Sequence, residues 1–218
     1  MSISPHLPPD EIRHLFAQAM SRMYRDEVPL YGDLMDLVTE VNAATLGADP
    51  ALAARLQRSD ALDRLDAERH GAIRVGTPRE LATLRRLFAV MGMQPVGYYD
   101  LAVAGVPVHA TAFRPIDAAS LARNPFRVFT SLLRLELIED AALREEAAQT
   151  LARRDIFTAG ARELIDAAER DGGLDEAQAD RFALEHLRCH VVELVRFENA
   201  FQADEGAEHE GRGQADEG

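Results

Sequence analysis

The sequence predicts an α+β fold, in which a helical N-terminal region precedes a βαβββ unit and further helices follow it. Three observations support this. Apolar residues recur at helical spacing through 1–66, strand signals enclose one helix in 67–138, and helical spacing returns in 139–200. The last stretch, 201–218, is acidic and glycine-rich without a large apolar residue, so we expect it to be disordered.

Composition narrows the class of protein. With 47% hydrophobic and 28% charged residues, the 218-residue chain is typical of a soluble globular protein. A net charge of -13 argues against binding to nucleic acid or to an anionic membrane. Cys189 is the single cysteine, which excludes an internal disulfide and a thiolate zinc site. No apolar run predicts a membrane span and no signal peptide is evident, so we expect a cytoplasmic protein.

Three helices are predicted before the strands. The first covers about 10–27 and places its large apolar residues on one stripe, namely Ile12, Leu15, Phe16, Ala19, Met20, Met23 and Tyr24. A second follows Gly32, and Asp49-Pro50 begins a third, with the aspartate as its cap. We interpret these stripes as core rather than as a cofactor site.

The segment 68–76 is the centre of the βαβββ unit. In a strand, alternation places His70, Ala72 and Arg74 on one face while Ile73 and Val75 enter the core. An imidazole that can hold a metal would then lie beside a guanidinium that can hold a carboxylate. The alternative is a core histidine and an unrelated surface arginine.

The rest of the unit follows in order. Thr77-Pro78-Arg79-Glu80 is a capping box that opens a helix ending near Gly92, and strands are predicted at 96–101, 106–113 and 126–138. We expect an open sheet with the helix on one face and His70 and Arg74 on the other. His109 lies in the second of these strands, where it joins them or, as we favour, faces solvent or a hydrogen-bond partner.

Five longer runs carry a resemblance to a known family. They are ERHGAIRVG (68–76), ELATLRR (80–86), GVPVH (105–109), TAFRPID (111–117) and NPFRVFTSLLRLELI (124–138). Through them, residues 10 to about 185 resemble the N-terminal part of the 2-oxoadipate dioxygenase/decarboxylase family, also called hydroxyglutarate synthase. Runs of this length are far more specific than a short motif.

The resemblance implies a non-haem Fe(II) enzyme on a vicinal-oxygen-chelate-like βαβββ core. Such an enzyme converts 2-oxoadipate and O2 into 2-hydroxyglutarate and CO2 in lysine degradation, with iron held by two histidines and one glutamate. His70 matches the first histidine ligand, at the place where substrate binds, and Arg74 matches the arginine that binds a carboxylate of the 2-oxo dicarboxylic acid. The second histidine and the glutamate lie downstream of the matched part.

From about His186 the chain departs from the family. We therefore assign no ligand role to four further residues of suitable type, which are His186, His190, Glu193 and His209. We expect a frameshifted or truncated gene product, or a fragment, which binds iron poorly, turns over little or nothing and self-associates through surface that a missing C-terminal half would cover. The alternatives are an inactive remnant that binds a 2-oxo acid or a partner, and a lyase or isomerase on the same fold.

Overall fold

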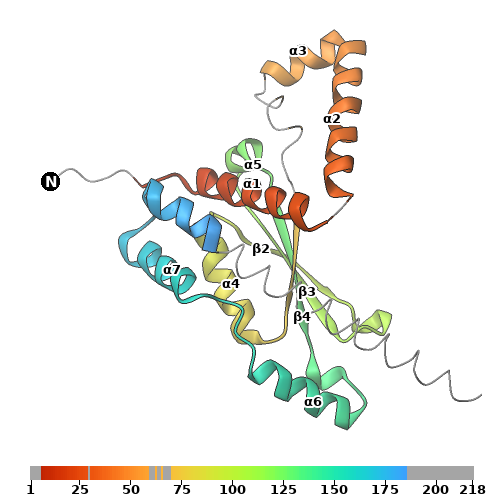
Figure 1. Cartoon of the computed structure of the whole chain (residues 1–218), viewed down its shortest axis with the longest axis vertical. Coiled ribbons are helices and arrows are strands. Elements are labelled where there is room, and N and C mark those ends of the chain that lie inside the picture. The colour runs from red at the N-terminus through yellow and green to blue at the C-terminus, as the bar shows by residue number, and fades with distance from the viewer. Residues whose placement is uncertain (1–5, 29, 59–61, 63–64, 66–69, 186–218) are drawn as a thin grey trace, which may run out of the picture.

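The computed structural model describes residues 6–28, 30–58, 62, 65 and 70–185 (Figure 1). The predicted N-terminal helices are confirmed as α1 (Pro9–Glu27), α2 (Tyr31–Ala48) and α3 (Pro50–Arg58). Asp49 caps α3 as predicted, because its Oδ1 accepts a hydrogen bond from the backbone N–H of Leu52 at 2.9 Å. Figure 1 shows α2 and α3 standing off from the other elements as a hairpin. None of the described helices combines the length and apolar character needed to cross a membrane.

The βαβββ unit is confirmed. It comprises β1 (His70–Val75), α4 (Pro78–Val90), β2 (Gln94–Asp100), β3 (Val108–Arg114) and β4 (Arg127–Leu133). The sheet order is β1-β4-β3-β2, with β1 parallel to β4 and the other pairs antiparallel. A long connection from β1 to β4 is needed because the end of β1 and the start of the parallel strand β4 lie at opposite ends of the strand pair.

Two details of this unit differ from the prediction. The strand expected at 126–138 ends at Leu133, and a 3-10 turn, Leu135–Leu137, follows it. Branched apolar residues (Leu135, Leu137 and Ile138) continue through the turn, so composition did not mark the end of the strand. A short helix, α5 (Ala118–Arg123), lies between β3 and β4 and was not predicted; Asp117 caps it by accepting a hydrogen bond from the N–H of Ser120.

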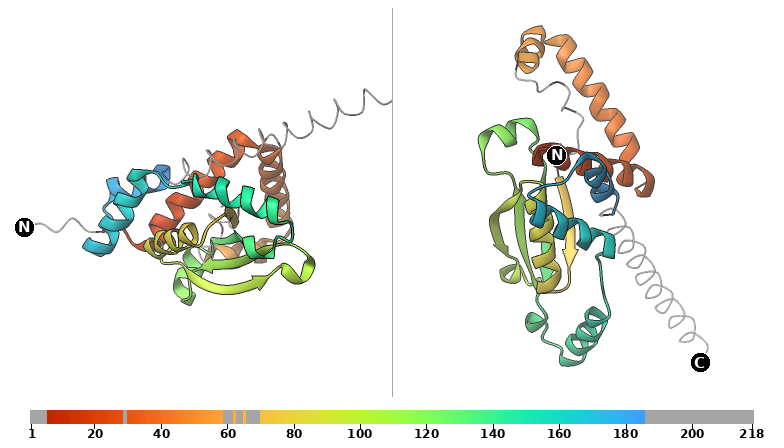
Figure 2. Two further views of the ribbon diagram at one scale, coloured as in Figure 1. Left: turned by 90° about the horizontal axis from the view of Figure 1, so that it is seen from below. Right: turned by 90° about the vertical axis from the view of Figure 1, so that its left-hand side faces the viewer.

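One face of the sheet packs on helices (Figure 2). After β4 come α6 (Ala141–Ala152), α7 (Ala159–Asp171) and helical residues 176–185. The core joins α1, α4, α7 and the sheet, and its largest buried apolar residues are Phe16, Phe88, Phe113, Phe126, Phe182, Ile12, Met20, Leu87, Met91, Met93 and Ile165. The predicted C-terminal helix is described only to 185, and the acidic tail lies outside the described residues. The division into four regions stays a prediction.

Arg13 holds α1 in place from inside the core. Its side chain is fully buried and donates hydrogen bonds to the backbone oxygens of Met91, Ser120 and Asn124 and to the carboxylate of Asp10. The oxygens of Met91 and Asn124 belong to the residues that follow α4 and α5, where carbonyls lack partners within the helix, whereas the oxygen of Ser120 also accepts the N–H of Asn124. One guanidinium therefore joins three helices beside the sheet.

Candidate substrate-binding face of the sheet

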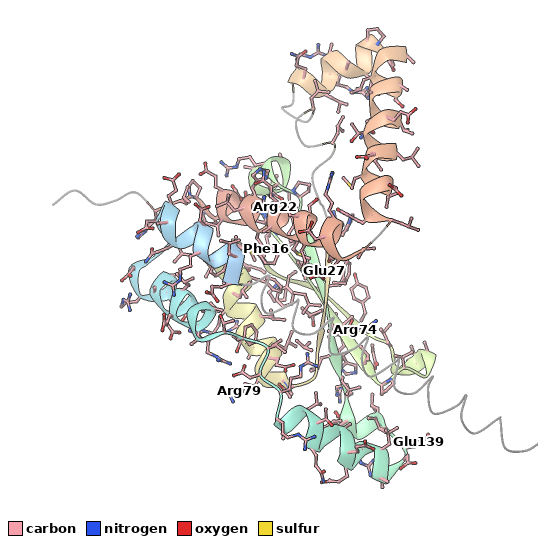
Figure 3. The ribbon with its side chains drawn as sticks, viewed as in Figure 1. Phe16, Arg22, Glu27, Arg74, Arg79 and Glu139 are labelled. Atoms are coloured by element: carbon pink, nitrogen blue, oxygen red, sulfur yellow. The ribbon has the colours of Figure 1, made fainter. Side chains whose placement is uncertain are left out.

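His70 and Arg74 share the face of β1 that points away from the core. Exposure alternates along the strand, so that His70, Ala72 and Arg74 are exposed while Gly71, Ile73 and Val75 are buried. The shared face predicted from the sequence is confirmed, and Figure 3 labels Arg74 on this strand. We call this side of the sheet, which no described helix crosses, the open face (Figure 2).

The neighbouring strands continue the open face. Strand β4 places Arg127, Phe129 and Ser131 opposite His70, Ala72 and Arg74 respectively. The rings of Phe129 and of Tyr99 on β2 lie 6.3 Å apart between centroids. Between them, β3 contributes two small residues, Ala110 and Ala112. The centre of the open face is thus apolar, and its polar groups lie towards β1.

Gly97 leaves space for the ring of Tyr99 on the open face. A Cβ atom there would lie 3.1–3.3 Å from the hydroxyl and ring atoms of Tyr99, which is tighter than side chains normally pack. Without a side chain at position 97, the Tyr99 ring can lie along the sheet towards Phe129. Sequence inspection gave no role to these aromatic residues, because their pairing depends on the register between β2, β3 and β4.

The open face carries positive charge in an acidic protein. Arg74 on β1, Arg127 on β4 and Arg114 on β3 belong to it by alternation and register. Asp100 is the single acidic residue in the four strands, and it points to the other side, where it pairs with His109. In a chain with a net charge of -13, these arginines are groups of the sheet whose chemistry suits an anion.

His109 does not join His70. It lies on the helix-covered side of β3, where its side chain is 16% exposed and its Nε2 lies 3.2 Å from Oδ1 of Asp100. The Tyr98 hydroxyl and the Arg134 guanidinium also hydrogen-bond to the imidazole. The favoured interpretation, a histidine with hydrogen-bond partners outside the site, is confirmed.

The turn after β1 holds the backbone of Arg74 in place. Glu80 accepts hydrogen bonds at Oε2 from the N–H of Gly76 at 2.6 Å and of Thr77 at 3.2 Å, which completes the predicted capping box. Its Oε1 lies 3.1 Å from Nε of Arg154, whose Nη2 donates to the carbonyl of Arg74 at 3.1 Å. The chain around Arg74 is therefore fixed from α4 and from the segment after α6.

The described residues fit an iron site only in part. Within the part of the chain that the structure describes, no group of three or more histidine, cysteine or acidic side chains can surround a metal ion. Of the two-histidine, one-glutamate set that the resemblance implies, the described residues thus include a match for the first histidine only, at His70. The four residues to which we assigned no ligand role from the sequence, His186, His190, Glu193 and His209, lie outside the described residues.

The comparisons with known proteins decide the family. The family described as 2-oxoadipate dioxygenase/decarboxylase matches residues 16–199, which is most of the chain. The chain belongs to this family. A 2-oxoadipate dioxygenase/decarboxylase of Shigella flexneri is 61% identical over 189 residues, and that of Pseudomonas putida is 58% identical over 187 residues.

Solved structures of the family agree. The hydroxyglutarate synthase of Pseudomonas putida matches with a TM-score of 0.81 and 57% identity over 86% of this chain. The same enzyme in complex with 2-oxoadipate also gives a TM-score of 0.81, with 58% identity over 86% of this chain. This chain spans 42% of the length of the Shigella relative and 43% of the first Pseudomonas structure, so it corresponds to less than half of those 2-oxoadipate dioxygenases.

Proposed function

We propose that this chain forms the N-terminal part of the active site of a non-haem Fe(II) dioxygenase that converts 2-oxoadipate and O2 into 2-hydroxyglutarate and CO2. The observation that carries the proposal is the open face, where His70 and Arg74 lie on one strand of a βαβββ unit in a chain of this family. The crystallised relative with bound 2-oxoadipate supports a 2-oxo dicarboxylic acid as the substrate. We place the activity in lysine degradation in the cytoplasm.

Two side chains have roles that their chemistry supports. A neutral His70 offers one imidazole nitrogen to Fe(II). Arg74 offers a planar fork of N–H donors, which suits the distal carboxylate of a dicarboxylic acid, and Tyr99 and Phe129 offer an apolar surface to the methylene groups between. Bound Fe(II) would supply the place where O2 and the keto acid meet. One ligand does not complete that site, so we assign no step of the reaction to the described residues beyond binding.

A second function is binding of a 2-oxo acid without catalysis. The arginines of the open face favour it, because a guanidinium can hold a carboxylate whether or not a metal ion is bound beside it. The two functions differ in one respect that can be measured, because binding alone consumes no oxygen.

Oxygen uptake after anaerobic loading with Fe(II) and addition of 2-oxoadipate tests the proposal. Because the described residues supply one ligand, we expect slow uptake at most, with CO2 and 2-hydroxyglutarate as products, and His70→Ala should abolish it. His109→Ala is the matched control, since this histidine lies on the other side of the sheet, and it should retain the uptake. Binding of 2-oxoadipate that needs Arg74 but gives no uptake would support the second function. Absence of binding would contradict both.

A further inference from the structure

Arg127 lies next to His70 on the open face. The two residues are Cα partners in the parallel pairing of β1 and β4, and neighbouring strands lie about 4.8 Å apart. Exposure alternates along β4, with Arg127 and Phe129 exposed while Val128 and Thr130 are buried. The side chain of Arg127 therefore emerges on the same side as that of His70.

The three arginines of the open face differ in what they contact. Arg114 donates a hydrogen bond to the carbonyl of Pro115 at 2.7 Å. The side chain of Arg127 makes no hydrogen bond or ion pair with any residue that the structure describes. Its guanidinium has five donors, and the described strands place no carboxylate on the open face, so it can bind an anionic ligand.

Arg74 and Arg127 lie at different distances from His70. Arg127 is level with His70, whereas Arg74 is four residues along β1, which is about 13 Å at roughly 3.3 Å per residue. Their side chains are long enough to reach inward over the intervening Ala72 and Phe129. The two guanidinium groups are thus placed to hold the two ends of one elongated dianion.

We propose that Arg127 binds the carboxylate next to the keto group of the substrate, beside His70, while Arg74 binds the distal carboxylate. This inference rests on the proposed function and adds to it a second residue for substrate binding. It also divides specificity between the arginines: Arg127 recognises any 2-oxo acid, and Arg74 selects those with a second carboxylate. A guanidinium can pair with a carboxylate through two parallel hydrogen bonds, so an arginine suits each end of the dianion.

Titration of the isotope-labelled, metal-free chain, followed by NMR, tests this division with two ligands of equal chain length. These are 2-oxoadipate, a dianion, and 2-oxohexanoate, which lacks the distal carboxylate. We expect Arg127→Gln to weaken binding of both ligands roughly 10- to 100-fold, as loss of a charge-assisted hydrogen bond does. Arg74→Gln should weaken binding of 2-oxoadipate by a similar factor and leave that of 2-oxohexanoate unchanged.

Two further variants serve as controls. Arg85→Gln removes the same charge from α4, on the helix-covered side of the sheet, and should leave both affinities unchanged. Arg127→Lys keeps the charge without the planar fork and should bind both ligands with intermediate affinity. The dispersion of the amide spectrum reports whether each variant is folded.

The outcomes separate this inference from the proposed function. Suppose that folded Arg127→Gln binds both ligands as tightly as the wild type does, while Arg74→Gln no longer binds 2-oxoadipate. The role proposed for Arg127 is then wrong, and the proposed function stands. If Arg127→Gln affects 2-oxoadipate alone, the assignment of the two carboxylates is wrong. If the wild type binds neither ligand, the proposed function fails, and the role of Arg127 fails with it.

Discussion

Arg13 shows how one side chain can organise the helices around a sheet. Burial lowers the pKa of its guanidinium, and the hydrogen bond that it donates to Asp10 opposes that shift. Arginine nevertheless keeps its charge in proteins, so the buried cation must be surrounded by acceptors. Three backbone carbonyls and one carboxylate provide them. Removing either the buried guanidinium or its acceptors should therefore lower the stability of the protein.

Replacing Arg13 by methionine should therefore destabilise the protein. The shorter side chain would fill part of the space but leave the oxygens of Met91 and Asn124 without the donor that Arg13 supplies, so we expect a loss of about 3–5 kcal/mol in the free energy of unfolding. Urea unfolding followed by circular dichroism measures it. Arg22→Met, on the exposed side of the same helix, is the control and should change stability by about 0.5 kcal/mol or less. Equal effects of the two substitutions would contradict the role of Arg13.

Ion pairs on the surface connect α4 to α7. The guanidinium of Arg86 on α4 lies 2.6 Å from carboxylate oxygens of both Asp166 and Glu169 on α7. The hydrogen bond from Arg86 holds the pKa of Glu169 below its ordinary value of 4.5. All three side chains are at least one-third exposed, so solvent weakens the pairing. We therefore expect these ion pairs to contribute little to the free energy of packing α7 against α4.

The contribution of Glu169 should depend on pH. Because its pKa is lower in the folded state, the ion pair stabilises the protein above about pH 4.5 and the benefit is lost as pH falls through the lowered value. Glu169→Gln should cost about 1 kcal/mol or less at pH 7. Thermal unfolding of both proteins between pH 7 and pH 3 should show this difference shrinking with acid. A constant difference across that range would exclude the ion pair as its cause.

The arrangement of whole helices leaves apolar surface uncovered. No residue of α2 is buried, and Leu34, Leu37 and Val41 are each more than half exposed along one stripe of that helix. These positions are spaced three and four residues apart, so their side chains form one continuous surface. From the sequence we expect self-association through surface left by a missing C-terminal half, and we propose that copies of this chain associate through this stripe.

Sedimentation velocity over a range of concentrations tests the association. The wild type should form dimers or larger species, and Leu34→Glu with Leu37→Glu should shift it towards the monomer. Salt should favour association, because it screens the acidic residues of the same helix, Asp33, Asp36 and Glu40. Val103→Glu, at a position 90% exposed in the connection after β2, is the control. A monomeric wild type at every concentration would contradict the proposal.

Much of the molecule follows from local patterns in the sequence. Alternation in 70–75 determines that His70 and Arg74 share a face, since side chains of a strand point to opposite sides in turn. The spacing of Thr77 and Glu80 determines where α4 begins, because both partners of the capping box lie within one turn. The long family-like runs determine which family the chain belongs to.

Only the tertiary structure decided which distant residues meet. The register of β4 against β1 brings Arg127 beside His70, although 57 positions separate them in the sequence. Register also turns His109 away from the open face, and the packing of α1 buries Arg13, a residue that composition alone would place at the surface. The physical reason is the same in each case. Local patterns specify which way a side chain points from its own backbone, whereas its neighbours depend on how separate elements pair and pack.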